Sequence, residues 1–331
     1  MTVVAAVRPY VPGLALLGGG AVLAAVIGGA VDALSPLVVA VVVGAVVGNT
    51  VGTPDAAEPG VDVDTLFLET GIVLLGAAVV VEEFLAAGPT VLGLVLVTVA
   101  GGLVLAEGVA RLLFRVGTPT SSLLAAGASI CGVSAVVAIG RVLDARGSAI
   151  TLAAGTVLLF DAVTLVAFPL AGEWLGLSSR QFGVWAGVSM FSTGPVAAAG
   201  FAHSPEAGQW ATVTKLARNA LLGGVAIAYS LAYTASSATE PGVRRLWTEF
   251  PKFLFGFLVV AAVANSGLLS TAALDSIGLV SDALFTLAFV GLGLSIRLRQ
   301  LRGVGAAAVG VVLVHLLVVS ALALGAVRWL L

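Results

Sequence analysis

Two basic residues lie inside an apolar stretch of this sequence. Lys215 and Arg218 are three residues apart within 208–234, and Asn219 follows directly. This spacing puts both cations on one face of a helix. A charge at the centre of a bilayer costs at least about 2.5–3.5 kcal/mol, so each needs a partner or a function. We interpret the pair as an anion site or a counter-charge pair; the alternative is that both side chains reach the membrane–water interface.

Asp161 is an acidic residue near the middle of another apolar stretch, 147–171. Its natural partner is Lys215 or Arg218, because an unpaired buried carboxylate favours its neutral form. A proton relay and a structural ion pair are both compatible with this position. Glu107 and His315 are interpreted as interfacial or packing residues.

Two segments rich in small residues repeat at an offset of 60. Ala126–Gly140 and Ala186–Gly200 both open with Ala-Gly-x-Ser and close with Val-x-Ala-x-Gly. Such interrupted segments predict broken helices at 127–134 and 189–196, whose backbone groups bind an ion or substrate at membrane depth. Close packing through small residues is the alternative. The substrate-binding candidates are Ser129, Cys131, Gly132, Ser134, Ser192, Thr193, Lys215, Arg218 and Asn219.

The composition is that of a membrane protein. Of 331 residues, 60% are hydrophobic and 10% charged, which leaves too little polar surface for a water-soluble domain. The net charge of -2 gives no nucleic-acid footprint, and the single cysteine excludes an internal disulfide. The sequence has no nucleotide-binding loop, metal-spaced cluster or nucleophile elbow, so we expect no enzyme activity, no catalytic residues, no cofactor and no metal.

Hydropathy predicts about eleven transmembrane helices, since each needs roughly 20 apolar residues. The linker 235–249 separates a block of eight spans (11–234) from a block of three (250–328), and we expect the whole chain, 1–331, to form a single transporter domain. The predicted spans are 11–32, 35–52, 65–84, 89–114, 120–142, 147–171, 181–202, 208–234, 250–270, 279–296 and 303–328.

The basic residues predict the orientation. With the N-terminus in the cytoplasm, ten of them lie at cytoplasmic ends and three, Arg141, Arg146 and Arg328, lie outside. We therefore expect a multi-pass protein of the cell membrane with an odd number of crossings. One conflict follows: segments two spans apart share an orientation, whereas an inverted repeat requires opposite ones. Either the repeat at offset 60 is coincidental, or one segment is re-entrant and the span count is wrong at 181–202.

Four short stretches stand in the order and spacing of a known family. They are Pro12–Leu16, Val47–Thr50, Gly127–Gly132 and Thr214–Arg218. Over nearly its whole length the chain resembles the YeiH-like sulfate exporter family. The resemblance implies an all-α, two-repeat membrane carrier with discontinuous helices. It also implies a fold related to the sodium/proton antiporter and bile-acid symporter group, with a panel and a core of crossed broken helices.

The chain departs from the family pattern at the expected site. Where the family reads Gly-Ser-Thr-x-His-Glu-x-Ala-Gln, Gly187–Pro195 lacks the His, the Glu and the Gln, and Gly140-Arg141 replaces a Glu-Pro. Asp161 stands where the family shows a small residue. Our hypothesis is that Asp161 replaces the lost coupling residues and pairs with Lys215 and Arg218.

Together these features predict a secondary transporter that exports a small anion, such as sulfate, a related sulfur oxyanion or a sulfonate, by alternating access. The alternative is a non-transporting membrane scaffold or sensor that has lost the coupling residues. The expected partners are the anion, a coupling proton or sodium ion, the lipid bilayer and a second copy in a homodimer. No nucleic-acid partner is expected.

Overall fold

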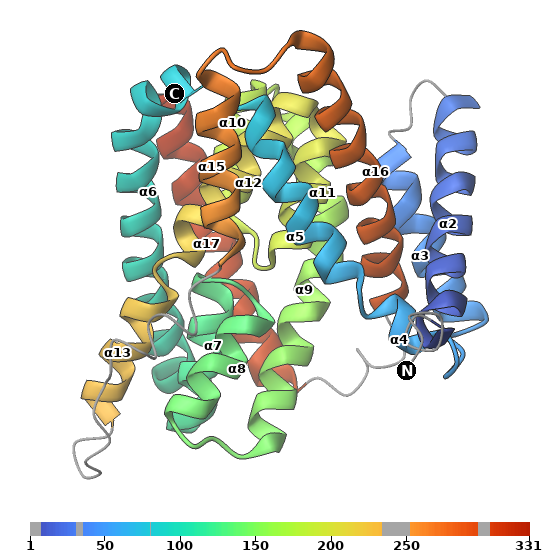
Figure 1. Ribbon diagram of the computed structural model, residues 1–331. Coiled ribbons are helices and arrows are strands. Elements are labelled where there is room, and N and C mark those ends of the chain that lie inside the picture. Colours follow the sequence, from blue (N-terminus) through green and yellow to red (C-terminus); the bar gives the residue numbers. More distant parts are fainter. Residues whose placement is uncertain (1–7, 31–35, 80, 234–251, 297–304) are drawn as a thin grey trace. The chain divides into compact units, whose positions relative to one another are not determined.

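The computed structural model describes residues 8–30, 36–79, 81–233, 252–296 and 305–331, and its regular elements there are all helices (Figure 1). The expected linker 235–249 lies outside the described residues. Within these described residues, and by length and composition alone, five helices are long and apolar enough to cross a membrane: Arg8–Ala30, Gly88–Leu113, Gly147–Trp174, Thr271–Ser295 and Ala306–Leu330. This is the fold of a polytopic helical membrane protein.

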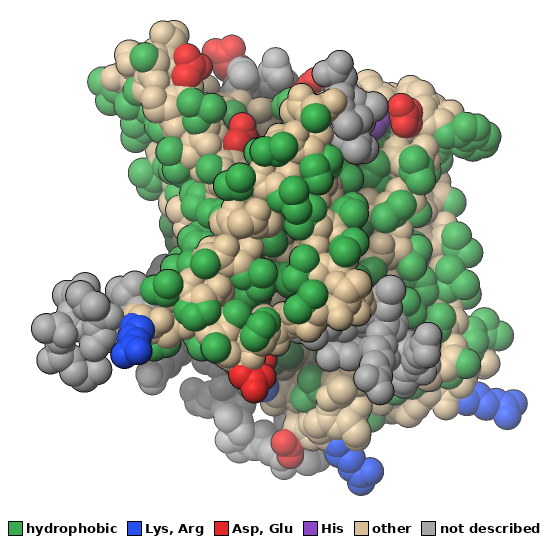
Figure 2. Space-filling view, turned by 90° about the vertical axis from the view of Figure 1, so that its right-hand side faces the viewer, with side chains coloured by type: hydrophobic (Ala, Val, Ile, Leu, Met, Phe, Trp, Pro, Cys, Tyr) green, Lys and Arg blue, Asp and Glu red, His purple; other side chains and the backbone are tan. Residues whose placement is uncertain are grey.

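Hydrophobic side chains cover the outside of α2 (Val11–Ala30) and α3 (Pro36–Thr50). Val22 and Val26 on α2 and Val42 and Val46 on α3 are all more than half exposed. Figure 2 shows hydrophobic side chains across the middle of this face, with the acidic and basic ones gathered toward its upper and lower margins. An apolar surface of this extent is suited to contact with lipid.

The chain forms two compact units, and each draws on both blocks of the sequence. Unit 1 comprises 1–85 and 252–299, and unit 2 comprises 86–251 and 300–331. The described helices of unit 1 are α2, α3, α4 (Glu58–Val61), α5 (Asp64–Leu75), α15 (Phe253–Asn265) and α16 (Thr271–Ser295), with the short η2 (Gly76–Ala78).

In unit 1, α16 packs against α3 and α5. A Cβ on Gly44 would lie 2.1 Å from the carbonyl oxygen of Val290, so glycine lets the backbones of α3 and α16 meet closely. Asn49 Nδ2 donates to the carbonyl of Ile296 at 2.6 Å. On the other side of α16, Ser281 Oγ donates to the carbonyl of Gly71 at 2.9 Å. Small residues and single polar contacts thus fix these helices.

Unit 2 contains the two interrupted segments. Its elements are α6 (Val81–Gly108) from residue 86 on, the π-helical η3 (Val109–Leu113), α7 (Thr118–Ser129), α8 (Val133–Val142), α9 (Gly147–Trp174), α10 (Ser179–Ser189), α11 (Thr193–His203), α12 (Pro205–Asn219), α13 (Leu222–Tyr233) and α17 (Ala306–Leu330).

The first interrupted segment, α7 and α8, is a helical hairpin, which corrects the prediction of one spanning helix over 120–142. A Cβ on Gly140 would lie 3.6 Å from Leu123 Cδ2, and one on Gly127 would lie 2.7 Å from Val136 Cγ2. In a continuous helix, Leu123 and Gly140 would be about 25 Å apart. The chain therefore reverses at 130–132, which we name tip A, and Figure 1 shows α7 and α8 side by side.

The second segment, α10 and α11, is also a hairpin, so the prediction of a spanning helix over 181–202 is corrected too. Ser204 Oγ donates to Ser179 Oγ at 2.9 Å, although a straight helix would separate these residues by about 38 Å. The rings of Phe182 and His203 stack with their centroids 4.2 Å apart. The reversal lies at 190–192, which we name tip B. Arms of 11 residues are only about 16 Å long, roughly half a bilayer core.

The long helix α9 shows that the two hairpins approach from opposite ends of unit 2. Near its start, α9 contacts the hairpin of α7 and α8, which we name hairpin A; there Ile150 lies against Gly140 and Val157 against Gly127. Further along, Phe160 meets Phe191 of tip B, with ring centroids 6.1 Å apart. Still later, the ring of Phe168 stacks on that of Trp185 at 4.2 Å, within α10. The tips therefore meet near the middle of α9.

Candidate functional site

Tip A and tip B are in direct contact. A Cβ on Gly132 would lie 2.1 Å from Ser192 Oγ, and Gly132 has a φ of +68°, so both space and backbone conformation require glycine there. Each tip ends one helix and starts another. It therefore offers the carbonyl groups of a helix C-terminus and the N–H groups of a helix N-terminus.

Lys215 and Arg218 bind the carbonyl groups at both tips. Lys215 Nζ donates to the carbonyl oxygens of Ile130 at 2.6 Å, of Met190 at 3.4 Å and of Phe191. Both cations come from α12 and are at most 1% exposed. They lie where the negative ends of the α7 and α10 dipoles meet, which is a favourable place for positive charge.

Arg218 spreads its guanidinium over the same two helix ends. Its Nε donates to the carbonyl of Ser129 at 2.7 Å, and its other nitrogens donate to carbonyls of both hairpins: Ala128, Gly187 and Met190. An anion near these cations would therefore be attracted by their charge rather than bound by their N–H groups. The N–H groups of Lys215 and Arg218 instead donate to backbone carbonyls.

Asp161 contacts tip B rather than a cation. Its Oδ1 accepts a hydrogen bond from the backbone N–H of Ser192 at 2.9 Å, while Oδ2 is buried without a partner. In the described part of the chain, the one ion pair within 4 Å is that of Arg111 with Glu107. Asp161 therefore forms no ion pair within 4 Å with the expected partners Lys215 and Arg218, whose donors bind backbone carbonyls, although it interacts with both electrostatically.

The helices that follow the tips, α8 and α11, begin with backbone N–H groups that make no hydrogen bond within the described residues. In the described chain, no hydrogen bond is made by the N–H groups of Val133, Ser134, Ala135, Thr193 and Gly194, which start α8 and α11. Ser134 is exposed and Thr193 is partly exposed. Helix N-termini with free N–H groups form favourable binding positions for anions.

Asn219 lies beside these donors. Its Nδ2 donates to Thr193 Oγ1 at 3.0 Å, and its Oδ1 is buried without a partner. The residues with at least partly exposed side chains at the helix starts are Ser134, Ser192 and Thr193, and the buried Asn219 supports Thr193. Lys215 and Arg218 are buried and bind the carbonyl groups of both tips.

The structure brings most of the predicted residues together at the tips. Cys131 and Gly132 form tip A with Ile130, and Ser192 belongs to tip B. Ser129 differs, because its hydroxyl lies 3.2 Å from His315 Nε2 and both residues are buried. Ser129 therefore contributes its carbonyl to Arg218 and its hydroxyl to α17. In the described residues, no group of three or more His, Cys, Asp or Glu is arranged to hold a metal.

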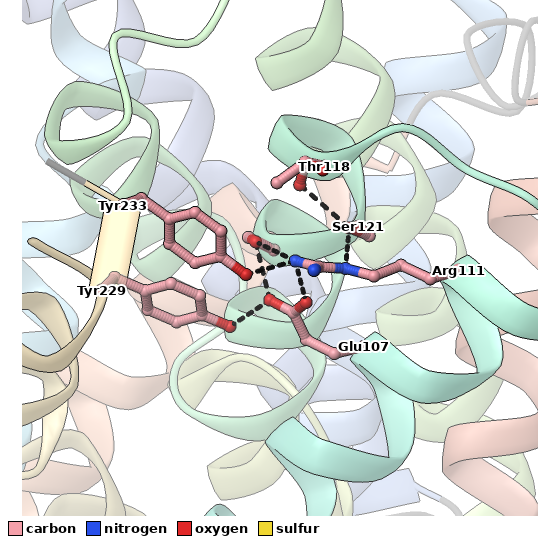
Figure 3. Close-up of polar contacts among 7 residues, drawn as sticks. Glu107, Arg111, Thr118, Ser121, Tyr229 and Tyr233 are labelled. Carbon is pink, nitrogen blue, oxygen red and sulfur yellow. Dashed lines mark hydrogen bonds and ion pairs between the residues drawn. The ribbon is translucent and has the colours of Figure 1, made fainter. Parts of the chain in front are cut away.

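A second polar cluster was missed by the sequence analysis, which interpreted Glu107 as an interfacial residue (Figure 3). Glu107 pairs with Arg111 and accepts hydrogen bonds from Ser122 Oγ at 2.6 Å and Tyr229 OH at 2.9 Å. Arg111 donates to Ser121 Oγ at 3.1 Å and to the hydroxyl of Tyr233. The cluster ties the start of hairpin A to α6, η3 and α13. Spacings of four in both pairs, Glu/Arg and Tyr/Tyr, were the available signal.

Comparison with known proteins gives a match over most of the chain. A family model described as "Conserved hypothetical protein 698" matches residues 12–312. A "UPF0324 membrane protein" of Nitratidesulfovibrio vulgaris is 31% identical over 91% of this chain and 88% of its own. One of Corynebacterium glutamicum is 31% identical, covering 90% and 86%. "UPF0324 membrane protein TauZ" of Paracoccus denitrificans is 32% identical, covering 74% and 73%. No solved structure matches.

Proposed function

This chain belongs to the conserved hypothetical protein 698 family, and from that premise we propose that it is a secondary transporter of a small anion, such as sulfate, a related sulfur oxyanion or a sulfonate. The observation that carries the proposal is the meeting of two helical hairpins from opposite ends of unit 2, with free N–H groups at both tips. Irregular backbone at membrane depth is tolerated where it is buried in protein or lines a cavity for substrate.

The anion would bind to the start of α8 and α11. The N–H groups of Ser134, Thr193 and Gly194 and the hydroxyl of Thr193 offer hydrogen bonds suited to the oxygen atoms of a sulfate or sulfonate group. Lys215 and Arg218 neutralise the opposite helix ends and so leave the positive ends of the dipoles to act on the ligand. Alternating access would expose these groups to one side of the membrane and then the other.

Two hairpins change the membrane topology that we propose. If 118–142 and 179–203 both return to the side they entered from, nine of the eleven expected spans remain as crossings, and the N-terminus stays in the cytoplasm. Arg141 and Arg146 then move to the cytoplasmic side, and Arg180 moves outside. The bias of basic residues rises from 10 against 3 to 11 against 2.

This topology also accounts for the repeat at offset 60. The two hairpins are separated by one crossing helix, α9, and therefore enter from opposite sides, as an inverted repeat requires. Paired hairpins replace the crossed broken helices that the family resemblance implies. A relation to the sodium/proton antiporter and bile-acid symporter group stays a prediction.

We propose Asp161 as the coupling residue. One of its carboxylate oxygens holds tip B, and the other is buried without a partner. A proton on Oδ2 would cancel the charge of a side chain that is bonded to the substrate-binding tip. Proton binding to Asp161 would thereby change the strength of its hydrogen bond to tip B.

Flux into proteoliposomes tests the transport proposal. Vesicles containing the purified protein should take up radiolabelled sulfate, sulfite or a sulfonate above the level of empty vesicles, and Thr193→Val should slow the uptake. Ser276→Ala is the control, because Ser276 is exposed on α16 and bonds only to its own helix. No uptake of any of these anions would count against the proposal.

The alternative is a membrane scaffold or sensor that binds an anion without moving it. The departures from the family pattern in Gly187–Pro195 and Gly140-Arg141 favour this alternative. Thermal stabilisation by sulfate or a sulfonate without flux would identify such a protein. Flux with saturable kinetics would exclude it.

A further inference from the structure

The carbonyl groups that end α7 and α10 are the groups that a coupling sodium ion would use. In carriers with interrupted helices, the C-terminal ends of half-helices and unwound carbonyls hold the coupling cation. Here six such carbonyls converge from the two hairpins: Ala128, Ser129, Ile130, Gly187, Met190 and Phe191. All six accept hydrogen bonds from Lys215 or Arg218.

Given the transport function proposed above, we propose that Lys215 and Arg218 are tethered cations that occupy the coupling-cation position, so that the carrier works without sodium. The ammonium group of Lys215 has three N–H donors and three carbonyl partners, and these belong to both tips. It fills the centre of this oxygen cluster with one positive charge, as a bound sodium ion would.

Because these cations are covalently part of α12, they do not leave during a transport cycle. The two tips therefore stay joined whether or not an anion is present. A sodium-dependent carrier differs, because its tips are joined only while the ion is bound and its stability rises with sodium concentration. This difference gives a test that does not depend on transport.

The experiment measures the thermal unfolding midpoint of the full-length protein in detergent, with sodium, potassium or choline chloride at equal ionic strength. Wild type should show the same midpoint in all three, within about 1 °C. Lys215→Ala leaves the buried carbonyls of Ile130 and Phe191 without a donor, since Met190 keeps Arg218, and it should lower the midpoint by about 5 °C or more. Methylammonium, which is small enough to replace the lost ammonium group, should recover at least half of that loss in a saturable way.

Lys252→Ala is the matched control, because Lys252 is exposed and is the chain's other lysine. It should neither lower the midpoint nor respond to methylammonium. If Lys215→Ala yields no folded protein, Lys215→Gln keeps two donors without the charge and is measured in its place.

A saturable rise of the wild-type midpoint with sodium would overturn the proposal, as would a Lys215→Ala protein as stable as wild type. Failure of methylammonium to restore Lys215→Ala would also count against it, as would a Lys215→Gln protein as stable as wild type. The protein could also show no anion flux and yet be insensitive to sodium and rescued by methylammonium. That result would support the tethered cations and reject only the proposed transport function.

Discussion

Asp161 and Asn219 each combine one bonded atom at tip B with one buried oxygen that has no partner. The Oδ1 atom of Asp161 holds the Ser192 N–H, and Asn219 Nδ2 holds the Thr193 hydroxyl. A buried polar atom without a hydrogen bond is costly, so such atoms point to a bound proton, water or ligand. Substitutions at these residues can remove the charge or the ligand contact while keeping the hydrogen bond that supports the fold.

Asp161→Asn keeps an oxygen that accepts from the Ser192 N–H but removes the charge. We expect a folded protein that still binds the anion, with uptake that no longer responds to a proton gradient. Asp161→Ala loses the hydrogen bond as well and should bind the anion more weakly. Flux at several imposed pH gradients measures the response, and an Asp161→Asn protein with full pH dependence would reject the coupling role.

Thr193→Val removes one hydroxyl that is shared between Asn219 and the proposed anion position. Loss of one hydrogen bond to a charged ligand costs about 1.5 kcal/mol or more, so affinity should fall about tenfold. Isothermal titration with sulfate or the transported sulfonate checks this. Thr286→Val, whose hydroxyl bonds only to its own helix in α16, should bind as wild type does; an equal loss in both variants would contradict the assignment.

The sequence predicted Lys215, Arg218 and the small-residue segments because a buried charge and a broken helix are both visible in one dimension. Their partners were not predictable. The cations bind backbone carbonyls of residues 85 to 90 positions away, and a backbone carbonyl is not marked by any residue type in the sequence. The sequence therefore pointed to a carboxylate, Asp161, as the partner.

Helical hairpins were the main departure from the expected elements. A hairpin arm and half of a spanning helix have the same hydropathy, and 120–142 is long enough to cross a bilayer as one helix. The distinguishing signal was the conflict between the repeat at offset 60 and the orientation of the spans. The structure resolves it through contacts between the two arms, such as that of Ser179 with Ser204.

A cysteine pair tests the hairpin of α10 and α11. In a Cys131→Ala background, Ser179→Cys and Ser204→Cys should form a disulfide on mild oxidation, because their hydroxyl oxygens lie 2.9 Å apart. Trypsin cuts after Arg180, so mass spectrometry of the unreduced digest should find peptides 147–180 and 181–215 linked. A spanning helix would keep these residues about 38 Å apart, and only unlinked peptides would then appear.

The Glu107 cluster should stabilise hairpin A at its base. Glu107→Ala leaves Arg111, Ser122 and Tyr229 without their shared acceptor (Figure 3), and we expect unfolding to become easier by about 1–2 kcal/mol. Because Arg111 is partly exposed, the ion pair itself contributes little of this. Glu107→Gln, which keeps an acceptor, should lose less. Thermal unfolding of both variants makes the comparison, and equal losses would show that the charge, not the hydrogen bonds, is what matters.

At the scale of the whole molecule, composition and hydropathy were sufficient to predict a polytopic helical membrane protein. They could not predict the two compact units, because each unit joins helices from both ends of the chain. The same limit applies to topology. The eleven-span and nine-crossing topologies both place the N-terminus inside and the C-terminus outside, so the positive-inside rule alone favours the second only modestly.

The sides on which α9 begins and ends test the opposed hairpins most directly. Ser148→Cys and Glu173→Cys, each in a Cys131→Ala background, place an exposed thiol at either end of that helix. With a membrane-impermeant maleimide on intact cells, nine crossings predict labelling at 173 and none at 148 until the cells are permeabilised. Glu206→Cys, which both topologies place outside, is the control. Labelling at 148 but not at 173 in intact cells would contradict the opposed hairpins and the site built on them.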